Sequence, residues 1–386
     1  MASSEVAGTR CLYFRFCKNI NINGSYIYSE RDQQEEPYGD TSRVSPLGSN
    51  IHAICIYSCE NMYINNCYFE NTKEDFRISH YDENSSKNKN IFISNYVSNN
   101  ASNNNLVAYT DNLYYTNSVL SPAIDMGNGD HGWYFTNDVT NIHIDNLTYI
   151  TKDNHFSGIF RTSGDTTMGD LYVSNSYIKG MALISTDYAN NLHFENVTFE
   201  HTTDGNIIFS GASNASFYFK NCIFKNINNR FYYAYNDNEN VYVDGCKFYF
   251  NTDYQNSVIQ PRPSPATVNG NVIINNCQFY NTTTYLVYIG AAATGFNVKV
   301  MNCYVESVTG QLFSKRNTSA KLFISNNVIM RIANLTTDGL YYNGGTDSTG
   351  LTMVNVYVSG YFQYASTGTM ANGKFLNCYH NDVLIE

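Results

Sequence analysis

The nine-residue stretch Asn-Val-Ile-Ile-Asn-Asn-Cys-Gln-Phe, residues 271–279, decides the fold because close relatives of it recur along the chain. The relatives read NMYINNCYF at 61–69, SFYFKNCIF at 216–224, NVYVDGCKF at 240–248 and NVKVMNCYV at 297–305. In each copy, apolar and variable residues alternate, and a bend residue then precedes Cys. Self-similarity at a fixed period of tens of residues is the signature of a repeat architecture.

The residue before the Cys position anchors the copies. It is Asn in twelve of them and Gly in two, namely Gly24, Asn66, Asn95, Asn117, Asn146, Asn175, Asn196, Asn221, Gly245, Asn276, Asn302, Asn326, Asn355 and Asn377. The twelve steps from Asn66 to Asn377 give a mean period of about 26 residues. The longer interval from Gly24 to Asn66 predicts an inserted loop at about 30–48.

Each copy predicts three short strands. Strict alternation of apolar residues over four to six positions indicates strand, and no stretch sustains the period of a helix. A coil of three short strands cannot bury its own apolar side chains, whereas stacked coils can. We therefore predict an all-β fold, a right-handed parallel β-helix of about 13–14 coils that forms a single domain over residues 1–386. Inserted loops are expected at about 30–48, 73–90, 121–140 and 251–270.

The Asn and Cys of the motif have structural interpretations. Asn tolerates the left-handed backbone conformation that a sharp bend requires, and Gly tolerates it better still. Stacked Asn side chains can also form hydrogen-bonded ladders along the coils. All ten Cys are interpreted as free thiols of the core, since no CxxC motif or Cys/His cluster at zinc spacing occurs. No metal site and no cofactor is expected, and free thiols favour folding in a reducing cytoplasm.

Composition excludes several classes of partner. The formal net charge is −10, charged residues make up 15% of the chain, and Lys and Arg form no cluster, so no nucleic-acid partner is expected. No run of 18 apolar residues occurs, which argues against membrane insertion. The first residues lack the pattern of a signal peptide. Coil-like sequence extends nearly to both ends, so we expect partner subunits or neighbouring domains to cover the end coils.

The motif with its Asn at the bend resembles the right-handed parallel β-helices of the pectin-lyase-like superfamily, over residues 11–380. That superfamily contains polysaccharide lyases, glycoside hydrolases, phage tailspikes and receptor-binding proteins, and adhesins. The best-known catalytic signatures are missing here: Asn251-Thr252-Asp253 matches one motif by letters only, and no Asp-Asp pair occurs.

The resemblance therefore implies first a tailspike-like or receptor-binding protein of a virus, with a cell-surface glycan or polysaccharide as partner. It implies a homotrimer or larger virion assembly at the tail or surface. A polysaccharide lyase or glycoside hydrolase, a structural virion or adhesin module, and an extracellular location are the alternatives.

One outward-facing position of the repeat is unusual. The residue between the paired apolar residues of the first strand should point away from the core. In eight consecutive copies it is aromatic or His: Tyr63, Phe92, Tyr114, His143, Tyr172, His193, Tyr218 and Tyr242. Three interpretations are open, namely self-stacking on an exposed sheet, burial against another subunit, and a sugar-binding platform that uses the aromatic faces.

If the chain is an enzyme, the first candidates lie beside this row. Asp145 and Glu195 lie two coils apart, about 9.5 Å at the usual strand spacing, and inverting glycosidases hold two carboxylates about 6.5–9.5 Å apart. Glu195 would be the general acid and Asp145 the base, with His143 and His193 around them. Two neighbouring segments, 121–140 and 151–165, are expected to be loops that bring Trp133 and Arg161 to a binding site.

Overall fold

The computed structural model describes most of the chain, in two compact units that comprise residues 1–190 and 191–386. The described residues are 10–28, 52–72, 74–82, 84–99, 101, 103–121, 132–151, 159–163, 168–180, 184–186, 191–201, 208–210, 214–234, 239–251, 257–261, 269–283, 285–290, 295–308, 312–315, 319–332, 341–342, 350–360 and 373–385. Every regular element among them is a β-strand. Of the four predicted loops, 30–48 lies outside the described residues.

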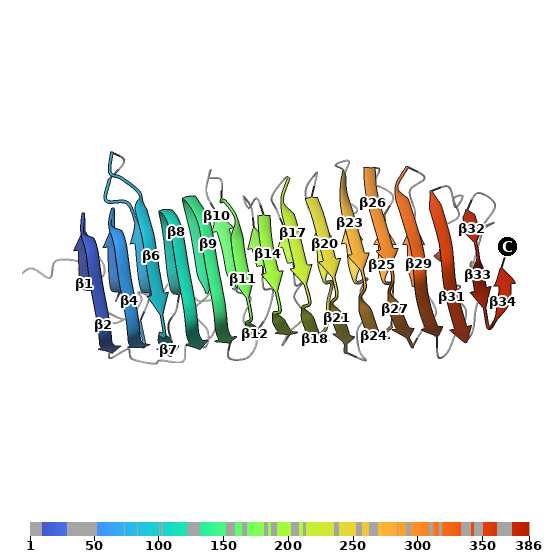
Figure 1. Cartoon of the computed structure of the whole chain (residues 1–386), viewed down its shortest axis with the longest axis horizontal. Helices are drawn as coiled ribbons and strands as arrows, with labels where there is room; N and C mark the ends of the chain where they lie inside the picture. The colour runs from blue at the N-terminus through green and yellow to red at the C-terminus, as the bar shows by residue number, and fades with distance from the viewer. Residues whose placement is uncertain are drawn as a thin grey trace, which may run out of the picture. The chain divides into compact units, whose positions relative to one another are not determined.

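The first unit stacks its strands in parallel (Figure 1). The strands that carry the anchor residues pair in the order β2 (Lys18–Tyr28), β4 (Glu60–Glu70), β6 (Asn88–Ser94) with β7 (Val97–Asn99), β8 (Asn103–Ser121), β9 (Trp133–Ile150), and β11 (Leu171–Ser174) with β12 (Tyr177–Gly180). A second series joins β1 (Arg10–Arg15), β3 (His52–Tyr57), β5 (Glu74–Ser79), β8, β9, β10 (Phe160–Ser163) and β13 (Ile184–Thr186).

The second unit repeats this arrangement. The strands before the bend pair in the order β14 (Asn191–Glu195), β17 (Ser216–Lys220), β20 (Glu239–Asp244), β23 (Asn269–Asn275), β26 (Gly295–Met301), β29 (Lys321–Ile332), β31 (Leu351–Gly360) and β32 (Lys374–Leu376). Those after the bend are β15 (Thr198–His201), β18 (Ile223–Ile227), β21 (Lys247–Phe250), β24 (Gln278–Thr282), β27 (Tyr304–Ser307), β29, β31 and β33 (Cys378–His380). The third series is β16 (Ile208–Ser210), β19 (Tyr232–Ala234), β22 (Ile259–Pro261), β25 (Val287–Ile289), β28 (Phe313–Lys315) and β30 (Tyr341–Tyr342). Among the strands that the structure describes, only β34 (Val383–Ile385) runs antiparallel, against β33, so the predicted class, an all-β parallel β-helix, is confirmed.

The bend residues have the conformation that the motif predicts. All fourteen anchors have a positive φ, between 48° at Asn175 and 76° at Gly24. This region is costly for most residues with a Cβ and is open to Gly and, at lower cost than most, to Asn. The two glycine replacements, Gly24 and Gly245, therefore meet the same backbone requirement as the asparagines.

Two amide ladders join the coils of the first unit, and the motif predicts only one of them. In the predicted ladder, Asn117 donates to Asn95 at 3.2 Å and accepts from Asn146 at 2.8 Å. The second ladder runs along an earlier bend of each coil, where Asn19, Asn61, Asn90, Asn112 and Asn141 also have positive φ and bond successively at 2.6–3.0 Å. Each coil is thus fixed to the previous one at two corners.

The core consists of the inward-facing residues of the alternating strands. Cys222, Cys246, Cys277 and Cys303 occupy one position on successive coils of the second unit, and all are buried free thiols. A free Cys packs in a core as a small hydrophobic residue. Eight of the ten Cys are buried as predicted, but Cys11 is exposed and Cys17 is only half-buried, so the prediction of ten core thiols is wrong for these two.

Three predicted loops contain strands. Segment 73–90, expected to be a charged surface loop, contains β5, in which Asp75, Phe76 and Ile78 are fully buried. Segment 121–140 includes the start of β9 at Trp133, and its residues 122–131 lie outside the described residues. Segment 251–270 contains β22 and the start of β23. These strands are short and carry charged or turn-forming residues, so their local sequence does not indicate a strand. They form because they pack against the neighbouring coils.

The buried carboxyl group of Asp75 accounts for part of this discrepancy. Its two oxygens accept hydrogen bonds from Thr72 Oγ1 at 2.6 Å and from Asn104 Nδ2 at 2.8 Å, and the same Asn104 amide also contacts Ser98 at 2.9 Å. Burial raises the pKa of Asp75 to about 6, against the opposing effect of hydrogen bonds from Asn104, Ser98 and Thr72. Asp75, which the sequence suggests is an exposed charged residue, is therefore a buried core residue whose carboxyl group holds its proton more strongly than usual.

The bend conformation can be tested at Asn117. Asn117→Gly removes two ladder hydrogen bonds but accommodates the φ of 52°, whereas Asn117→Ala removes the same bonds and adds backbone strain. We expect the order of stability wild type, Gly variant, Ala variant, with the Ala variant about 1 kcal/mol less stable than the Gly variant. Urea unfolding monitored by circular dichroism measures this, and an Ala variant as stable as the Gly variant would contradict it.

The pKa of Asp75 predicts a pH dependence. Because the folded-state pKa of about 6 lies above the ordinary value of 3.8, the protonated carboxyl favours the folded state, and this stability is lost as the pH rises from about 4 through 6. The loss amounts to about 3 kcal/mol. Asp75→Asn should abolish it in unfolding measurements between pH 4 and pH 7. Asp82→Asn is the control with opposite sign, because the Ser85 hydroxyl lowers the pKa of the exposed Asp82. Parallel profiles for wild type and Asp75→Asn would refute the assignment.

Candidate functional site

The outward aromatic residues of the first unit form one continuous row. They occupy the same register position on β4, β6, β8, β9 and β11, and each stacks face to face on the next, with ring centroids 4.8–5.0 Å apart and planes within 8° of parallel: Tyr63, Phe92, Tyr114, His143 and Tyr172. The residues on both sides of each ring in the sequence are buried, as Met62 and Ile64 are beside Tyr63. We call these five residues the aromatic row.

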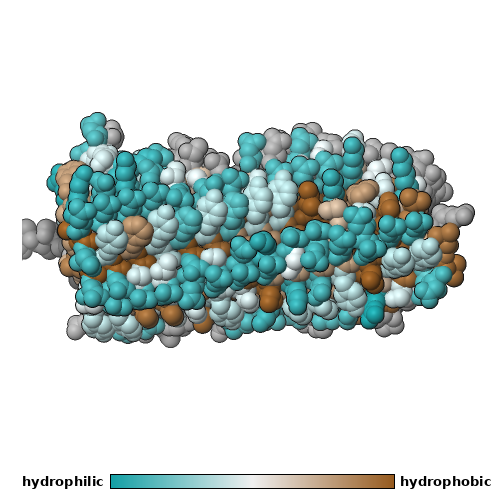
Figure 2. All heavy atoms as spheres, in the orientation of Figure 1, coloured by the Kyte–Doolittle hydropathy of each residue, from teal (hydrophilic) through white to brown (hydrophobic). Residues whose placement is uncertain are grey.

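The second unit has a shorter row of the same kind. His193, Tyr218 and Tyr242 stack at centroid distances of 4.5 and 4.8 Å on β14, β17 and β20. On β23 the position is taken by Ile273, paired in register with Tyr242. Figure 2 shows pale and brown side chains in a band that crosses the strands between hydrophilic side chains. Of the three interpretations of these rows, self-stacking is the one that the ring geometry supports directly.

Self-stacking changes what the aromatic row can offer to a ligand. A ring between two parallel neighbours has both faces covered, so only its edge and any hydroxyl point outward. Tyr63 differs because its neighbour on the other side, on β2, is Asn21, and its side chain is 47% exposed. Tyr63 is therefore the ring of this row best placed to stack on an apolar sugar face.

A row of polar side chains runs parallel to the aromatic row, two residues further along each strand. Its members are Asn65, Ser94, Thr116, Asp145 and Ser174, which are also in register. Four of them bond to one another or to the anchor asparagines: Ser94 donates to Asn65 at 3.0 Å, and Ser174 to Asp145 at 2.6 Å. We call these five residues the polar row.

The predicted acid–base pair consists of two carboxylates with different surroundings. Asp145, in the first unit, accepts hydrogen bonds from Ser174 Oγ at 2.6 Å and Asn175 Nδ2 at 2.8 Å. Glu195, in the second unit, forms an ion pair with Lys220 at 2.7 Å. That ammonium group lies against one of the two carboxylate oxygens of Glu195. The pairing of Asp145 with Glu195 stays a prediction, because its members belong to different units.

His143 lies between two rings of the aromatic row. Its ring stacks on Tyr114 and Tyr172, and its Nε2 lies 2.8 Å from Asn141 Oδ1. Burial lowers the pKa of the imidazole, which favours the neutral form. His143 therefore serves in this structure as a stacked, hydrogen-bonded ring of the row.

The two residues expected on binding loops lie instead on strands. Trp133 begins β9 and is fully buried, with its ring edge-on to Tyr115 at 5.4 Å, so it cannot reach a ligand on the outer face. Arg161 is half-buried on β10, with its guanidinium 5.8 Å from the ring of Tyr134. The burial of Trp133 could have been predicted from its alternation with Phe135, because residues two apart on a strand face the same side and both of these face the core.

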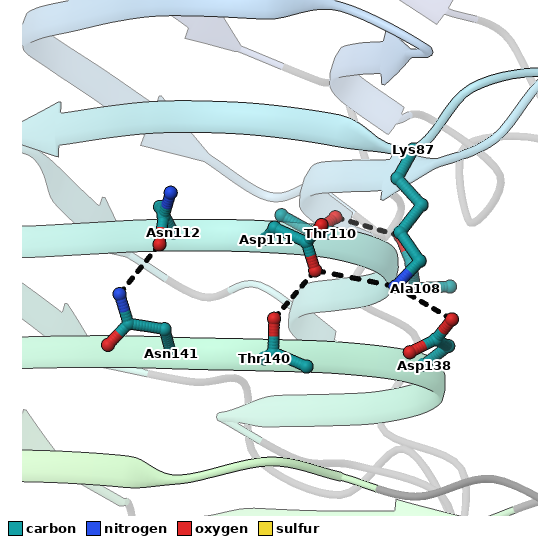
Figure 3. Close-up of polar contacts among 8 residues, drawn as sticks. All are labelled: Lys87, Ala108, Thr110, Asp111, Asn112, Asp138, Thr140 and Asn141. Atoms are coloured by element: carbon teal, nitrogen blue, oxygen red, sulfur yellow. Dashed lines mark hydrogen bonds and ion pairs between the residues drawn. The ribbon is translucent and has the colours of Figure 1, made fainter.

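A charged cluster at a corner of the first unit was not predicted. Lys87 lies 2.7 Å from Asp138 and 3.4 Å from Asp111, and Thr140 donates to Asp111 at 2.6 Å (Figure 3). Burial lowers the pKa of Lys87, but the two carboxylates outweigh it and raise the pKa overall. The cluster joins three coils and was missed because Lys87 and Asp138 fall in segments interpreted as loops.

Neither a metal-binding cluster nor a membrane-spanning helix occurs among the described residues. No group of three or more His, Cys, Asp or Glu side chains among them is arranged to hold a metal ion. No helix in this part of the chain is long and apolar enough to cross a membrane.

The chain was compared with protein-family models, with curated proteins and with solved structures, and none of the three comparisons gives a match. The structure thus shows the parallel β-solenoid, and the likeness to pectin-lyase-like proteins remains a resemblance of the repeat motif.

The stacked position of His143 predicts a second pH effect. Since the folded-state pKa is lowered, the unfolded chain binds the proton more readily, and stability is lost as the pH falls below about 6.5, the unperturbed value. His143→Tyr keeps a stacking ring and removes this titration. The stability of the variant relative to wild type should therefore increase from pH 7.5 to pH 5.5 in thermal melts. A constant difference would contradict a neutral His143.

Proposed function

We propose that the chain is a tailspike-like or receptor-binding β-helix protein that binds a cell-surface glycan along the aromatic and polar rows of its first unit. The observation that carries the proposal is the pairing of these two rows in one register over five successive coils. Each coil offers a ring edge and a hydrogen-bonding group at the same spacing of about 4.8 Å. A ligand that is itself a linear repeat can make similar contacts at successive coils.

The chemistry of the rows favours a neutral polysaccharide over a charged polymer. Four of the five residues in the polar row are neutral amides or hydroxyls, and Asp145 already accepts two hydrogen bonds. Tyr and Ser hydroxyls both donate and accept, as sugar hydroxyls do. The ring edges supply apolar contact, and Tyr63 supplies an aromatic face.

The proposal extends to assembly and location. The motif resemblance supports a homotrimer displayed at the tail or surface of a virion. Light scattering of the purified chain at micromolar concentration tests the trimer, and a monomer would refute that part alone.

Glycan binding is tested on a polysaccharide array with the wild type and two tyrosine variants. Tyr63→Ala removes the exposed ring face and should weaken binding at least about fivefold, since one aromatic stacking contact contributes about 1–3 kcal/mol. Tyr357→Ala is the matched control, because Tyr357 is 42% exposed and stacks on Tyr379 in the second unit. Equal losses in both variants, or no glycan bound by the wild type, would refute the proposal.

The same array gives a readout for catalysis. If bound glycan is cleaved, new reducing ends or unsaturated products appear, and Glu195→Gln should abolish them while leaving binding intact. Binding without turnover supports a receptor-binding role without catalysis.

A further inference from the structure

Two cysteines that lie outside the repeat motif are neighbours on adjacent coils of the first unit. Because Lys18 pairs in register with Glu60, Cys17 lies beside Cys59. The N–H of Glu60 donates to the carbonyl oxygen of Cys17 at 2.9 Å, and the N–H of Cys17 donates to the sulfur of Cys59 at 3.4 Å. The two thiols are thus held together at one corner of the unit.

Both cysteines have the local geometry of the motif cysteines. The residue before each, Phe16 or Ser58, has a φ of 53°, which is in the left-handed range of the anchor residues. Each thiol then donates to the carbonyl oxygen two residues earlier, at 3.4 Å from Cys17 and 3.3 Å from Cys59. The two side chains therefore have the same orientation. With a coil spacing of about 4.8 Å, their Cα atoms fall in the range of about 4.4–6.8 Å that a disulfide needs.

The corner also leaves room for a bond to close. Bonded cysteines have Cβ atoms about 3.5–4.5 Å apart, so the two coils must approach by about 1 Å. Both cysteines lie between strands, since β1 ends before Cys17 and β4 begins after Cys59. The backbone can adjust there without breaking a strand ladder.

The next coil continues this column with an amide. Asn88 follows Cys59 in register, and its Oδ1 accepts the N–H of Cys59 at 2.9 Å. Along the column, Cys59 therefore meets a thiol on one side and an amide on the other. The column of four motif cysteines in the second unit is different, because its inner members have a thiol on both sides and all four are buried.

The two thiols differ in access and in acidity. Cys17 is half-buried, whereas Cys59 is 1% exposed. Burial raises the pKa of Cys59, which keeps this thiol protonated and slows its reaction with an oxidant, since the thiolate is the reactive form. Cys17 is therefore the sulfur that an oxidant reaches first, and Cys59 is the resolving thiol beside it.

We propose that Cys17 and Cys59 form a reversible disulfide that joins their two coils in an oxidising environment. With hydrogen peroxide as oxidant, the sulfur of Cys17 takes one peroxide oxygen to become a sulfenic acid, and water leaves. The sulfur of Cys59 then attacks that of Cys17, so the S–S bond forms and the S–O bond breaks. The second water carries away the sulfenic oxygen and the thiol proton of Cys59.

The bond acts on a long loop of the chain. It joins residues 42 positions apart, and a disulfide restricts the unfolded chain more when the loop that it closes is long. The disulfide therefore opposes the local opening in which β2 separates from β4. It is independent of the proposed glycan binding, because neither cysteine belongs to the aromatic row or the polar row.

Oxidation of the reduced full chain with hydrogen peroxide tests the pair. Remaining thiols are then alkylated, and peptide mapping by mass spectrometry without reduction identifies the bonds. We expect a peptide pair linked through Cys17 and Cys59, loss of two of the ten thiols, and recovery of both with dithiothreitol. A bond to Cys11, a bond between two chains, sulfinic acid at Cys17 without a bond, or no loss of thiols would each overturn the proposal.

Variants separate this disulfide from general oxidation. Cys11→Ser is the matched control, because it removes the exposed thiol of β1 and should still form the bond. Cys17→Ser and Cys59→Ala should not form it, and circular dichroism establishes that all three variants are folded. Oxidation should slow hydrogen exchange in β2 at least about tenfold in wild type and Cys11→Ser only, with β23 unchanged throughout. Equal slowing in Cys17→Ser, or no slowing where the bond has formed, would contradict the joining of the coils.

Discussion

The structure depends on one constraint, which is that a coil of three short strands can bury its apolar residues only against the coils before and after it. Each coil must therefore bend at the same place and stack in register. The asparagine at the bend meets both requirements, since it accepts the left-handed conformation and its amide bonds to the previous coil. Stacked thiols, rings and polar residues follow from that register, because equivalent residues of successive coils come to lie about 4.8 Å apart.

In-register stacking also determines what the surface can do. A residue repeated at one position interacts first with its own copies, so the rings of the aromatic row cover one another and the polar row is internally hydrogen bonded. Chemistry that needs a free ring face or an isolated carboxylate is therefore expected where a row ends or is interrupted. In the first unit the row begins at Tyr63, whose neighbour on β2 is Asn21. In the second unit the row ends before Ile273, which takes the position after Tyr242.

The fold could be predicted because the signal is repeated: fourteen anchors reinforce one another, and each has the expected positive φ. The site was predicted less well. The outward row followed from alternation alone, whereas the face-to-face ring geometry depends on packing between coils. Trp133 and β5 were misplaced because charged and turn-forming neighbours suggested loops, although Asp75 is buried with hydrogen-bonding partners from residues as distant as Asn104. The second ladder was missed although its asparagines begin the quoted motif, as Asn61 does in NMYINNCYF, because only the residue before Cys was interpreted as a bend.

The amide ladders add a polarity that the backbone lacks. Parallel strands present both donors and acceptors along each edge, so backbone bonding alone does not distinguish the two sides of a coil. Side-chain amides do distinguish them, because Asn90 and Asn112 each donate to the coil before and accept from the coil after. Asp145, beside the anchor Asn146, keeps that direction, because it accepts a hydrogen bond from Asn175 of the following coil. The direction of stacking is therefore set by side chains and not by the backbone.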